Sequence, residues 1–369
     1  MLRLIGLWLV FSVAALAQSS LQRALELARQ GQYAQARKLL EGVPEPGDLR
    51  QRIAFHRLKA AIASGLHEPQ QAVQEIRAAL ALAPDDPHLL LAAAAAELQA
   101  GQLESALSHA QASPESAAKE ALIGDIQEKR GEAVQAAKAY ELAVTLQPRE
   151  ERYRIALGLE LIEHQRATEA IEMLQRSAAE FPSSAKIRTL CGIAQYAEGY
   201  IADAVRSLEA AIQIDPKLDA PYAALSKIVL QSSAPPSEAV IHDLCRWDRL
   251  VCSALQLRLA RENGDRELQA KAIADLERAP SDNVVSRCEL ARAYEWSGQL
   301  ARARAAMESC AHLDPSPQNL YRLGLLYQRL GLTDLAQKQM EQRKEMLRRM
   351  SEQTALSLSA LEGFKLSIH

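Results

Sequence analysis

Small, apolar and polar residues recur in the same order along most of this chain. The recurrence is clearest in the middle, where Pro148, Pro182 and Pro216 stand 34 residues apart and each ends one segment of the pattern. A fixed period of this length indicates that one supersecondary unit is repeated. Glycines lie near the fifteenth place of most repeats, where a left-handed conformation can end a helix. They are Gly31, Gly101, Gly131, Gly199, Gly264, Gly298 and Gly331. The pattern therefore predicts pairs of helices.

Two places in each repeat hold small side chains. At these places we expect two antiparallel helices to touch, because a leucine there would push the pair apart. The eighth place holds Ala24, Ala60, Ala94, Gly124, Gly158, Gly192, Ser226, Ala291 and Gly324. The twentieth place holds Ala36, Ala72, Ala106, Ala136, Ala170, Ala204, Ala303 and Ala336.

Segments such as GQYAQARKLL and GYIADAVRSLEAAIQIDP resemble the tetratricopeptide-repeat family. Tyr33 and Ile201 lie where the family usually has an aromatic residue. The resemblance covers residues 18–345 as about ten repeats. It implies an all-α fold, a right-handed α-solenoid of helix-turn-helix repeats. A helix that continues to about Leu356 is expected to cap the solenoid, and we assign residues 346–369 to this capping helix and a tail.

The repeat is least regular over residues 231–281. The repeat that begins near Asp219 is interrupted by the segment SSAPP at 232–236, and the next repeat has Leu257 and Gln269 at the two small places. Two interpretations remain open. The stretch is a bend or hinge in the solenoid, or it is a diverged repeat that packs normally.

The first residues have the pattern of a secretory signal. Arg3 precedes an apolar run over residues 4–16, and Ala15-Leu16-Ala17 comes before the polar Gln18. We expect cleavage after Ala17 and a periplasmic or secreted protein without a membrane span in its mature form. An uncleaved anchor is the alternative, although the run is shorter than the roughly 20 residues that cross a bilayer.

Composition narrows the range of functions. Aromatic residues make up only 4% of the chain, which suits closely packed helices rich in alanine and leucine. The net charge of −3 is not that of a nucleic-acid-binding surface. The sequence contains no G-x-S-x-G elbow, phosphate-binding glycine-rich loop or dinucleotide fingerprint. We therefore expect neither an enzyme nor a cofactor. An enzymatic pocket would have to lie outside the repeat pattern, around residues 231–281.

Four of the five cysteines cluster between residues 245 and 310. Export makes disulfides plausible, and we pair Cys245 with Cys252 and Cys288 with Cys310, since each pair would link adjacent antiparallel helices. Cys191 lies at a regularly buried place and is interpreted as a core residue. His242, Cys245 and Cys252 could supply three metal ligands, but no CxxC or HExxH spacing accompanies them. We predict no metal site.

The resemblance to tetratricopeptide repeats implies that first helices line a groove, with the second, fifth, sixth, ninth, twelfth and thirteenth places pointing into it. In the central repeats these places hold an apolar strip edged by cations, which would suit an amphipathic or acidic peptide. The residues are Arg152, Ile155, Leu159, Ile162, Lys186, Leu190, Ile193, Tyr196 and Lys227. The alternative is that these side chains are buried between neighbouring first helices or against another copy of the chain.

Toward the C-terminus the same places carry residue types that dominate interface energetics. This second surface includes Glu289, Arg292, Glu295, Trp296, Tyr321, Arg322, Leu325 and Arg329. Some members of the family hold a carboxylate through a Lys and Asn arrangement, but no Asn occupies a groove place here. We expect a non-catalytic scaffold or adaptor of the cell envelope that binds another protein or peptide. The alternative is a self-associating or permanently complexed envelope subunit.

Overall fold

The computed structural model describes residues 20–231 and 236–353. The predicted signal segment, most of the interrupting segment and the predicted tail lie outside these residues. The described residues are helical, with turns between the helices and no strand among them. The protein is thus an all-α repeat solenoid.

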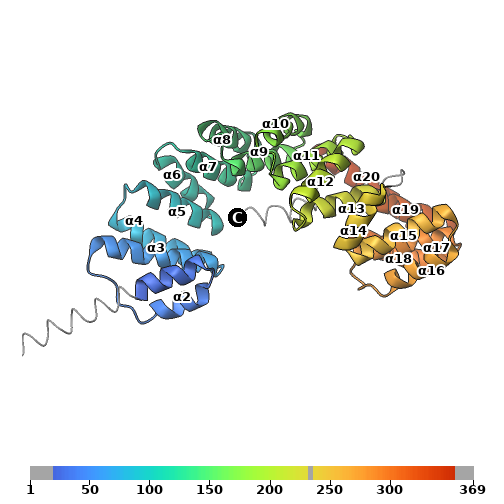
Figure 1. Ribbon diagram of the computed structural model, residues 1–369, viewed down its shortest axis with the longest axis horizontal. Coiled ribbons are helices and arrows are strands. Elements are labelled where there is room, and N and C mark those ends of the chain that lie inside the picture. Colours follow the sequence, from blue (N-terminus) through green and yellow to red (C-terminus); the bar gives the residue numbers. More distant parts are fainter. Residues whose placement is uncertain (1–19, 232–235, 354–369) are drawn as a thin grey trace, which may run out of the picture. The chain divides into compact units, whose positions relative to one another are not determined.

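The helices alternate between a first and a second helix of each repeat. The first helices are residues 20–29, α3 (Leu49–Gly65), α5 (Pro87–Gln99), α7 (Ala117–Lys129), α9 (Glu151–Glu163), α11 (Ala185–Ala197), α13 (Asp219–Gln231), α15 (Arg249–Asn263), α17 (Val284–Trp296) and α19 (Pro317–Arg329). The second helices are α2 (Tyr33–Leu40), α4 (Pro69–Leu82), α6 (Leu103–Ala112), α8 (Ala133–Leu146), α10 (Ala167–Glu180), α12 (Ile201–Ile214), α14 (Glu238–Trp247), α16 (Arg266–Glu277), α18 (Leu300–Leu313) and α20 (Thr333–Gln353). Consecutive helices lie side by side in pairs (Figure 1).

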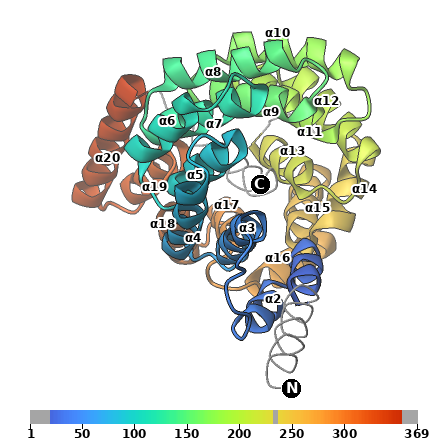
Figure 2. The same cartoon turned by 90° about the vertical axis from the view of Figure 1, so that its left-hand side faces the viewer.

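The chain forms two compact bodies, Met1–Glu160 and Leu161–His369. In the second body, which we call the C-terminal body, α11, α13 and α15 each contact the next first helix (Figure 2). Each repeat therefore meets its neighbours in sequence, as in other solenoids, and its stability depends on these interfaces.

The small residues lie where two helices of a repeat touch. Ala36, Ala72 and Ala106 are completely buried, and so is Ala94 at the eighth place. Gly192 shows the steric reason, because a Cβ atom there would lie 2.8 Å from Leu208 Cγ of the second helix. The contact distance leaves room for no larger side chain.

The turn between the helices is left-handed in most repeats. All seven glycines near the fifteenth place have a positive φ, between 71° and 81°. His67 and Gln165 take the same conformation without glycine, with φ of 58° and 57°. The repeats of His67 and Gln165 thus keep the left-handed turn without glycine, at a steric cost.

Two disulfides lie in the C-terminal body, between the same cysteines that we paired from the sequence. Cys245 of α14 and Cys252 of α15 have Cα atoms 4.3 Å apart, and Cys288 of α17 and Cys310 of α18 are 4.9 Å apart. Cys191 is a buried free thiol, and burial raises its pKa. One disulfide thus joins two repeats in the irregular region, and the other joins the two helices of one repeat.

The last described helix, α20, is the longest of those described and runs for 21 residues. Figure 2 shows it beside α19. Within the described parts of the chain, no helix combines the length and apolar character needed to cross a membrane.

A candidate arginine-lined binding cleft

The apolar members of the predicted central groove are core residues. Ile155, Leu159, Ile162, Leu190 and Ile193 are all buried, with at most 7% of each residue exposed. A partner cannot reach these side chains in the folded chain. Their burial agrees with the alternative interpretation, in which they pack inside the protein and do not form an apolar binding strip.

The polar members of that groove are more accessible but already have partners or partial cover. Arg152 is exposed and donates a 2.8 Å hydrogen bond to the Tyr153 hydroxyl. Tyr196 is partly buried and donates to Gln231 Oε1 at 2.7 Å. Lys186 and Lys227 are each partly buried. Of these four residues, Arg152 and Tyr196 thus donate hydrogen bonds within the chain, and the two lysines are partly covered.

The second surface is accessible. Trp296 is 57% exposed and Tyr321 is 43% exposed. Arg322 and Arg329 are also exposed. Arg329 forms an ion pair with Glu295 of the preceding first helix, and the Arg343 guanidinium lies 5.0 Å from the centre of the Tyr321 ring. The aromatic and cationic side chains expected here thus lie on the surface of the C-terminal body.

Beside this surface is a cleft with a volume of about 340 Å³, formed mainly by α15 and α17 with contributions from α13, α16 and α19. Its walls combine four arginines with two glutamates and one exposed aromatic ring. The lining residues are Leu230, Gln231, Leu257, Arg258, Arg261, Glu262, Gln269, Glu289, Arg292, Ala293, Trp296 and Arg322. The second surface predicted from the sequence supplies only part of this set.

Sequence reasoning missed Arg258, Arg261 and Glu262. They occupy the ninth, twelfth and thirteenth places of the irregular repeat, which are groove places. The available signal was the same register that located Arg292 and Trp296. Leu257 and Gln269 obscure that register, because they break the small-residue pattern of the repeat.

Two of the four arginines hold the end of α13. Arg258 donates to the carbonyl oxygen of Val229 at 2.8 Å, and Arg292 donates to that of Leu230 at 3.1 Å. The last carbonyl groups of a helix lack partners within the helix, and cations are favoured beside them. Arg258 and Arg292 therefore fix the point at which the chain leaves the first helix of the interrupted repeat.

Glu289 is the buried acid of the cleft. Only 8% of the residue is exposed, and it forms an ion pair with Arg292. Burial raises the pKa of Glu289, while the positive charges of Arg292, Arg322, Arg258 and Arg261 act in the opposite direction. Glu289 is thus paired with Arg292 and lies within electrostatic reach of the other three arginines.

Arg261 and Arg322 have no such fixed partner. Neither donates a hydrogen bond within the described part of the chain, and both residues are exposed. Partial desolvation lowers the pKa of Arg322, and the neighbouring charge of Arg292 lowers it further. Four arginines against two glutamates leave an excess of two positive charges in the cleft.

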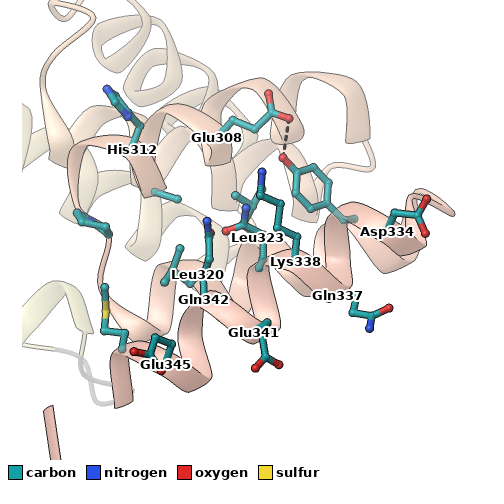
Figure 3. Close-up of a pocket in the computed structure, with 15 residues that line it drawn as sticks. Glu308, His312, Leu320, Leu323, Asp334, Gln337, Lys338, Glu341, Gln342 and Glu345 are labelled. Atoms are coloured by element: carbon teal, nitrogen blue, oxygen red, sulfur yellow. Dashed lines mark hydrogen bonds between the residues drawn. The ribbon is translucent and has the colours of Figure 1, made fainter. Parts of the chain in front are cut away.

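A larger cleft, of about 1470 Å³, lies between α18, α19 and α20 (Figure 3). Leu320 and Leu323 of α19 face polar side chains of α20 that include Lys338 and Gln342. At one side the Tyr327 hydroxyl donates to Glu308 at 2.8 Å. Its charged groups are of mixed sign and include no cluster comparable to the four arginines.

The structure does not bring together the possible metal ligands. Cys245 and Cys252 are bonded to each other, and His242 lies beside Asp243, with 3.3 Å between Nδ1 and Oδ1. No group of three metal-binding side chains occurs among residues 20–231 and 236–353.

Comparison with known proteins places residues 161–228 in the family model described as tetratricopeptide repeat. These residues include α10, α11 and α12. No curated protein matches the chain.

Several solved structures are similar in fold. The C-terminal part of a TPR repeat-containing protein from Cytophaga hutchinsonii is 15% identical, with 69% of this chain and 94% of that chain covered and a TM-score of 0.45. A tetratricopeptide repeat protein from Parabacteroides merdae is 14% identical, with coverages of 77% and 98% and a TM-score of 0.44. YrrB, a TPR protein with an unusual peptide-binding site, is 20% identical, with coverages of 51% and 95% and a TM-score of 0.38.

Proposed function

Because the chain is a protein of the tetratricopeptide-repeat family, we propose that it is a non-catalytic scaffold that binds a segment of another protein. The binding surface is the second surface together with the arginine-lined cleft beside it. The observation that carries this proposal is the exposure of Trp296 and Tyr321 next to that cleft. Large aromatic side chains and arginines dominate protein interfaces.

The cell envelope or the extracellular space is the proposed location. The N-terminal pattern of Arg3, an apolar run and Ala15-Leu16-Ala17 supports export. The two disulfides support it as well, since such bonds persist in oxidising compartments and are rare in the cytosol.

The experiment that tests the scaffold is affinity capture with the chain from Gln18 onward and an envelope extract of the host. The parent is compared with a Trp296→Ala/Tyr321→Ala variant, and bound proteins are identified by mass spectrometry. A matched control is Val134→Ala, which removes a side chain of 62% exposure from α8. Circular dichroism establishes that all three proteins fold equally.

We expect a protein that the parent and the control retain and the double variant loses. Equal capture by all three proteins would remove the second surface from consideration. Trp296 and Tyr321 make no buried packing contact that would unfold the chain when they are truncated, since about half of each residue is exposed.

A self-associating envelope subunit is the second candidate. It is favoured by α20, which exposes Leu335 and Leu347 near the large cleft, because repeats bury their faces by stacking on a neighbour. Light scattering on the purified chain separates the two functions. A monomer at micromolar concentration favours the scaffold, and a stable oligomer that Leu335→Glu/Leu347→Glu dissociates favours the subunit.

A further inference from the structure

From the charges and contacts of the cleft, we infer that Arg261 and Arg322 bind the side-chain carboxylates of an acidic, extended segment of a partner protein. The inference rests on the proposed function and names the chemistry of the partner. It starts from the division of the four arginines into two that donate hydrogen bonds within the chain, Arg258 and Arg292, and two that do not but lie within electrostatic reach of Glu289.

Arg258 and Arg292 are committed to the fold. Both donate to carbonyl groups at the end of α13, and Arg292 also pairs with Glu289. They hold the walls of the cleft in place and have few guanidinium donors left for a ligand. Arg292 Nε is buried without a hydrogen-bond acceptor among the described residues.

Arg261 and Arg322 supply the excess charge. Their planar guanidinium groups carry donors in the geometry that a carboxylate accepts through both oxygens. They come from different first helices, α15 and α19, and α17 with Trp296 lies between these two in the chain order of first helices. A ligand that reaches both must therefore extend across more than one repeat.

The spacing of the repeats favours acidic side chains over a single chain terminus. Neighbouring helices pack about 8–10 Å apart, and an extended peptide advances about 3.3 Å per residue. Carboxylates at roughly every third residue would then match successive first helices, and two carboxylates about six residues apart would match α15 and α19. One terminal carboxylate would meet only one of the two guanidinium groups and leave the other positive charge unmatched.

A nucleic acid fits the cleft less well than a peptide. Glu262 and Glu289 line the same walls and would repel a dense row of phosphates, and the chain carries a net charge of −3. Single-stranded nucleic acids also bind through several stacked aromatic rings, whereas the cleft offers only Trp296.

The test uses the chain from Gln18 onward and fluorescence anisotropy. The probe is a labelled nine-residue peptide with glutamate at every third position, small neutral residues elsewhere and an amidated C-terminus. A second peptide has glutamine in place of each glutamate. Further arms are a labelled six-nucleotide oligo(A) RNA and competition by inorganic phosphate.

We expect the glutamate peptide to bind at least tenfold more tightly than the glutamine peptide at 50 mM salt, with weaker binding at 300 mM because salt screens exposed charges. Arg261→Gln/Arg322→Gln should raise Kd at least tenfold. The control Arg206→Gln removes an exposed arginine from α12 and should leave Kd unchanged.

Arg322 also lies near the buried Glu289, so its substitution could destabilise the fold. A second variant therefore leaves Arg322 in place. Arg261→Gln alone changes an exposed residue and should raise Kd at least threefold.

Equal affinity of the glutamate and glutamine peptides would overturn the inference, as would unchanged binding by both variants. The inference would also be overturned if the RNA bound more tightly than the glutamate peptide. It would be overturned as well if inorganic phosphate displaced the peptide at a concentration as low as the Kd of the peptide. If acidic peptides fail while Trp296→Ala/Tyr321→Ala still abolishes capture of a partner, the scaffold stands and only its carboxylate chemistry is wrong.

Discussion

The ring of Tyr140 lies directly against Gly124: a Cβ atom on the glycine would come within 2.5 Å of a ring carbon of the tyrosine. The two residues belong to the first and second helices of one repeat, at the eighth and twenty-fourth places. Gly192 with Leu208, and Gly324 with Met340, repeat the same relationship. The eighth place is thus small because the second helix presents a large side chain to it.

Gly124→Ala should therefore destabilise the protein by about 1–3 kcal/mol, the usual range for overpacking a core contact. The expected signature is a lower urea midpoint with an unchanged slope. Gly42→Ala is the control, because nothing lies within 4 Å of a Cβ atom there. A decrease as large in the control as in Gly124→Ala would count against the steric explanation.

The same pair predicts a strong coupling. In a Tyr140→Ala background the ring is gone, and Gly124→Ala should then be neutral or stabilising, because alanine favours a helix over glycine by roughly 1 kcal/mol. A double-mutant cycle measures this directly. Additive effects of the two substitutions would show that Tyr140 is not what excludes a side chain at position 124.

Gln165→Gly is a second prediction, and it concerns the backbone. Gln165 holds a φ of 57° at a turn where seven other repeats have glycine. The left-handed conformation costs a non-glycine residue roughly 1–2 kcal/mol, part of which glycine loses again through its greater freedom in the unfolded chain. We expect a gain of about 0.5–1 kcal/mol in the free energy of unfolding.

The urea midpoint checks that gain, and Gly131→Ala serves as the reverse substitution. Gly131 has a φ of 76°, so alanine there should destabilise. Opposite signs for the two variants are the expected result. A loss of stability in Gln165→Gly would mean that the glutamine side chain contributes more than its backbone conformation costs.

The sequence predicted the repeat architecture well because its signals are steric and local. The small eighth and twentieth places and the turn glycines each depend on one contact or one backbone angle. The left-handed turn at Gln165 escaped prediction because the consensus glycine is absent there.

The candidate site was predictable only in part. The position of a residue in the repeat predicts which face of the helix it occupies. It does not predict how closely the next first helix approaches that face. Leu190 and Ile193 hold groove places and are nevertheless fully covered. Arg261 holds such a place in a repeat whose small residues have diverged. Burial and cleft formation depend on packing between repeats, which the periodicity of one repeat does not contain.

The buried Glu289 makes a prediction about pH. Burial raises its pKa, against the opposing charges of four arginines. A carboxyl group with a higher pKa in the folded chain binds its proton more tightly there. Its contribution to stability is then present below the unfolded pKa of about 4.3 and is lost as pH rises through the folded pKa. Stability of Glu289→Gln relative to the parent should therefore increase as pH rises from acidic values to 7.

Glu308 gives the opposite sign and serves as the reference. Burial raises its pKa, but hydrogen bonds from Arg304 and Tyr327 lower it more, and the net pKa lies below its ordinary value. Its contribution is present above the unfolded pKa and lost as pH falls. Relative to the parent, Glu308→Gln should become less stable as pH rises. Denaturant titrations between pH 4 and 7 measure both differences, and trends of the same sign would contradict the prediction.

The disulfide between Cys288 and Cys310 makes the last prediction. It closes a loop with a sequence separation of 22 residues between the two helices of one repeat. Constraining a loop of this length in the unfolded chain stabilises a protein by about 3 kcal/mol, and a loop of 7 residues, as between Cys245 and Cys252, by about 2 kcal/mol. Cys288→Ala/Cys310→Ala should accordingly lower the thermal midpoint more than Cys245→Ala/Cys252→Ala.

Reductant is the control. It should lower the thermal midpoint of the parent and leave unchanged that of a variant lacking all four disulfide-bonded cysteines, since Cys191 is buried and unpaired in both. If the longer loop proves the less stabilising, native packing around Cys310, which is fully buried, governs the effect in place of loop entropy.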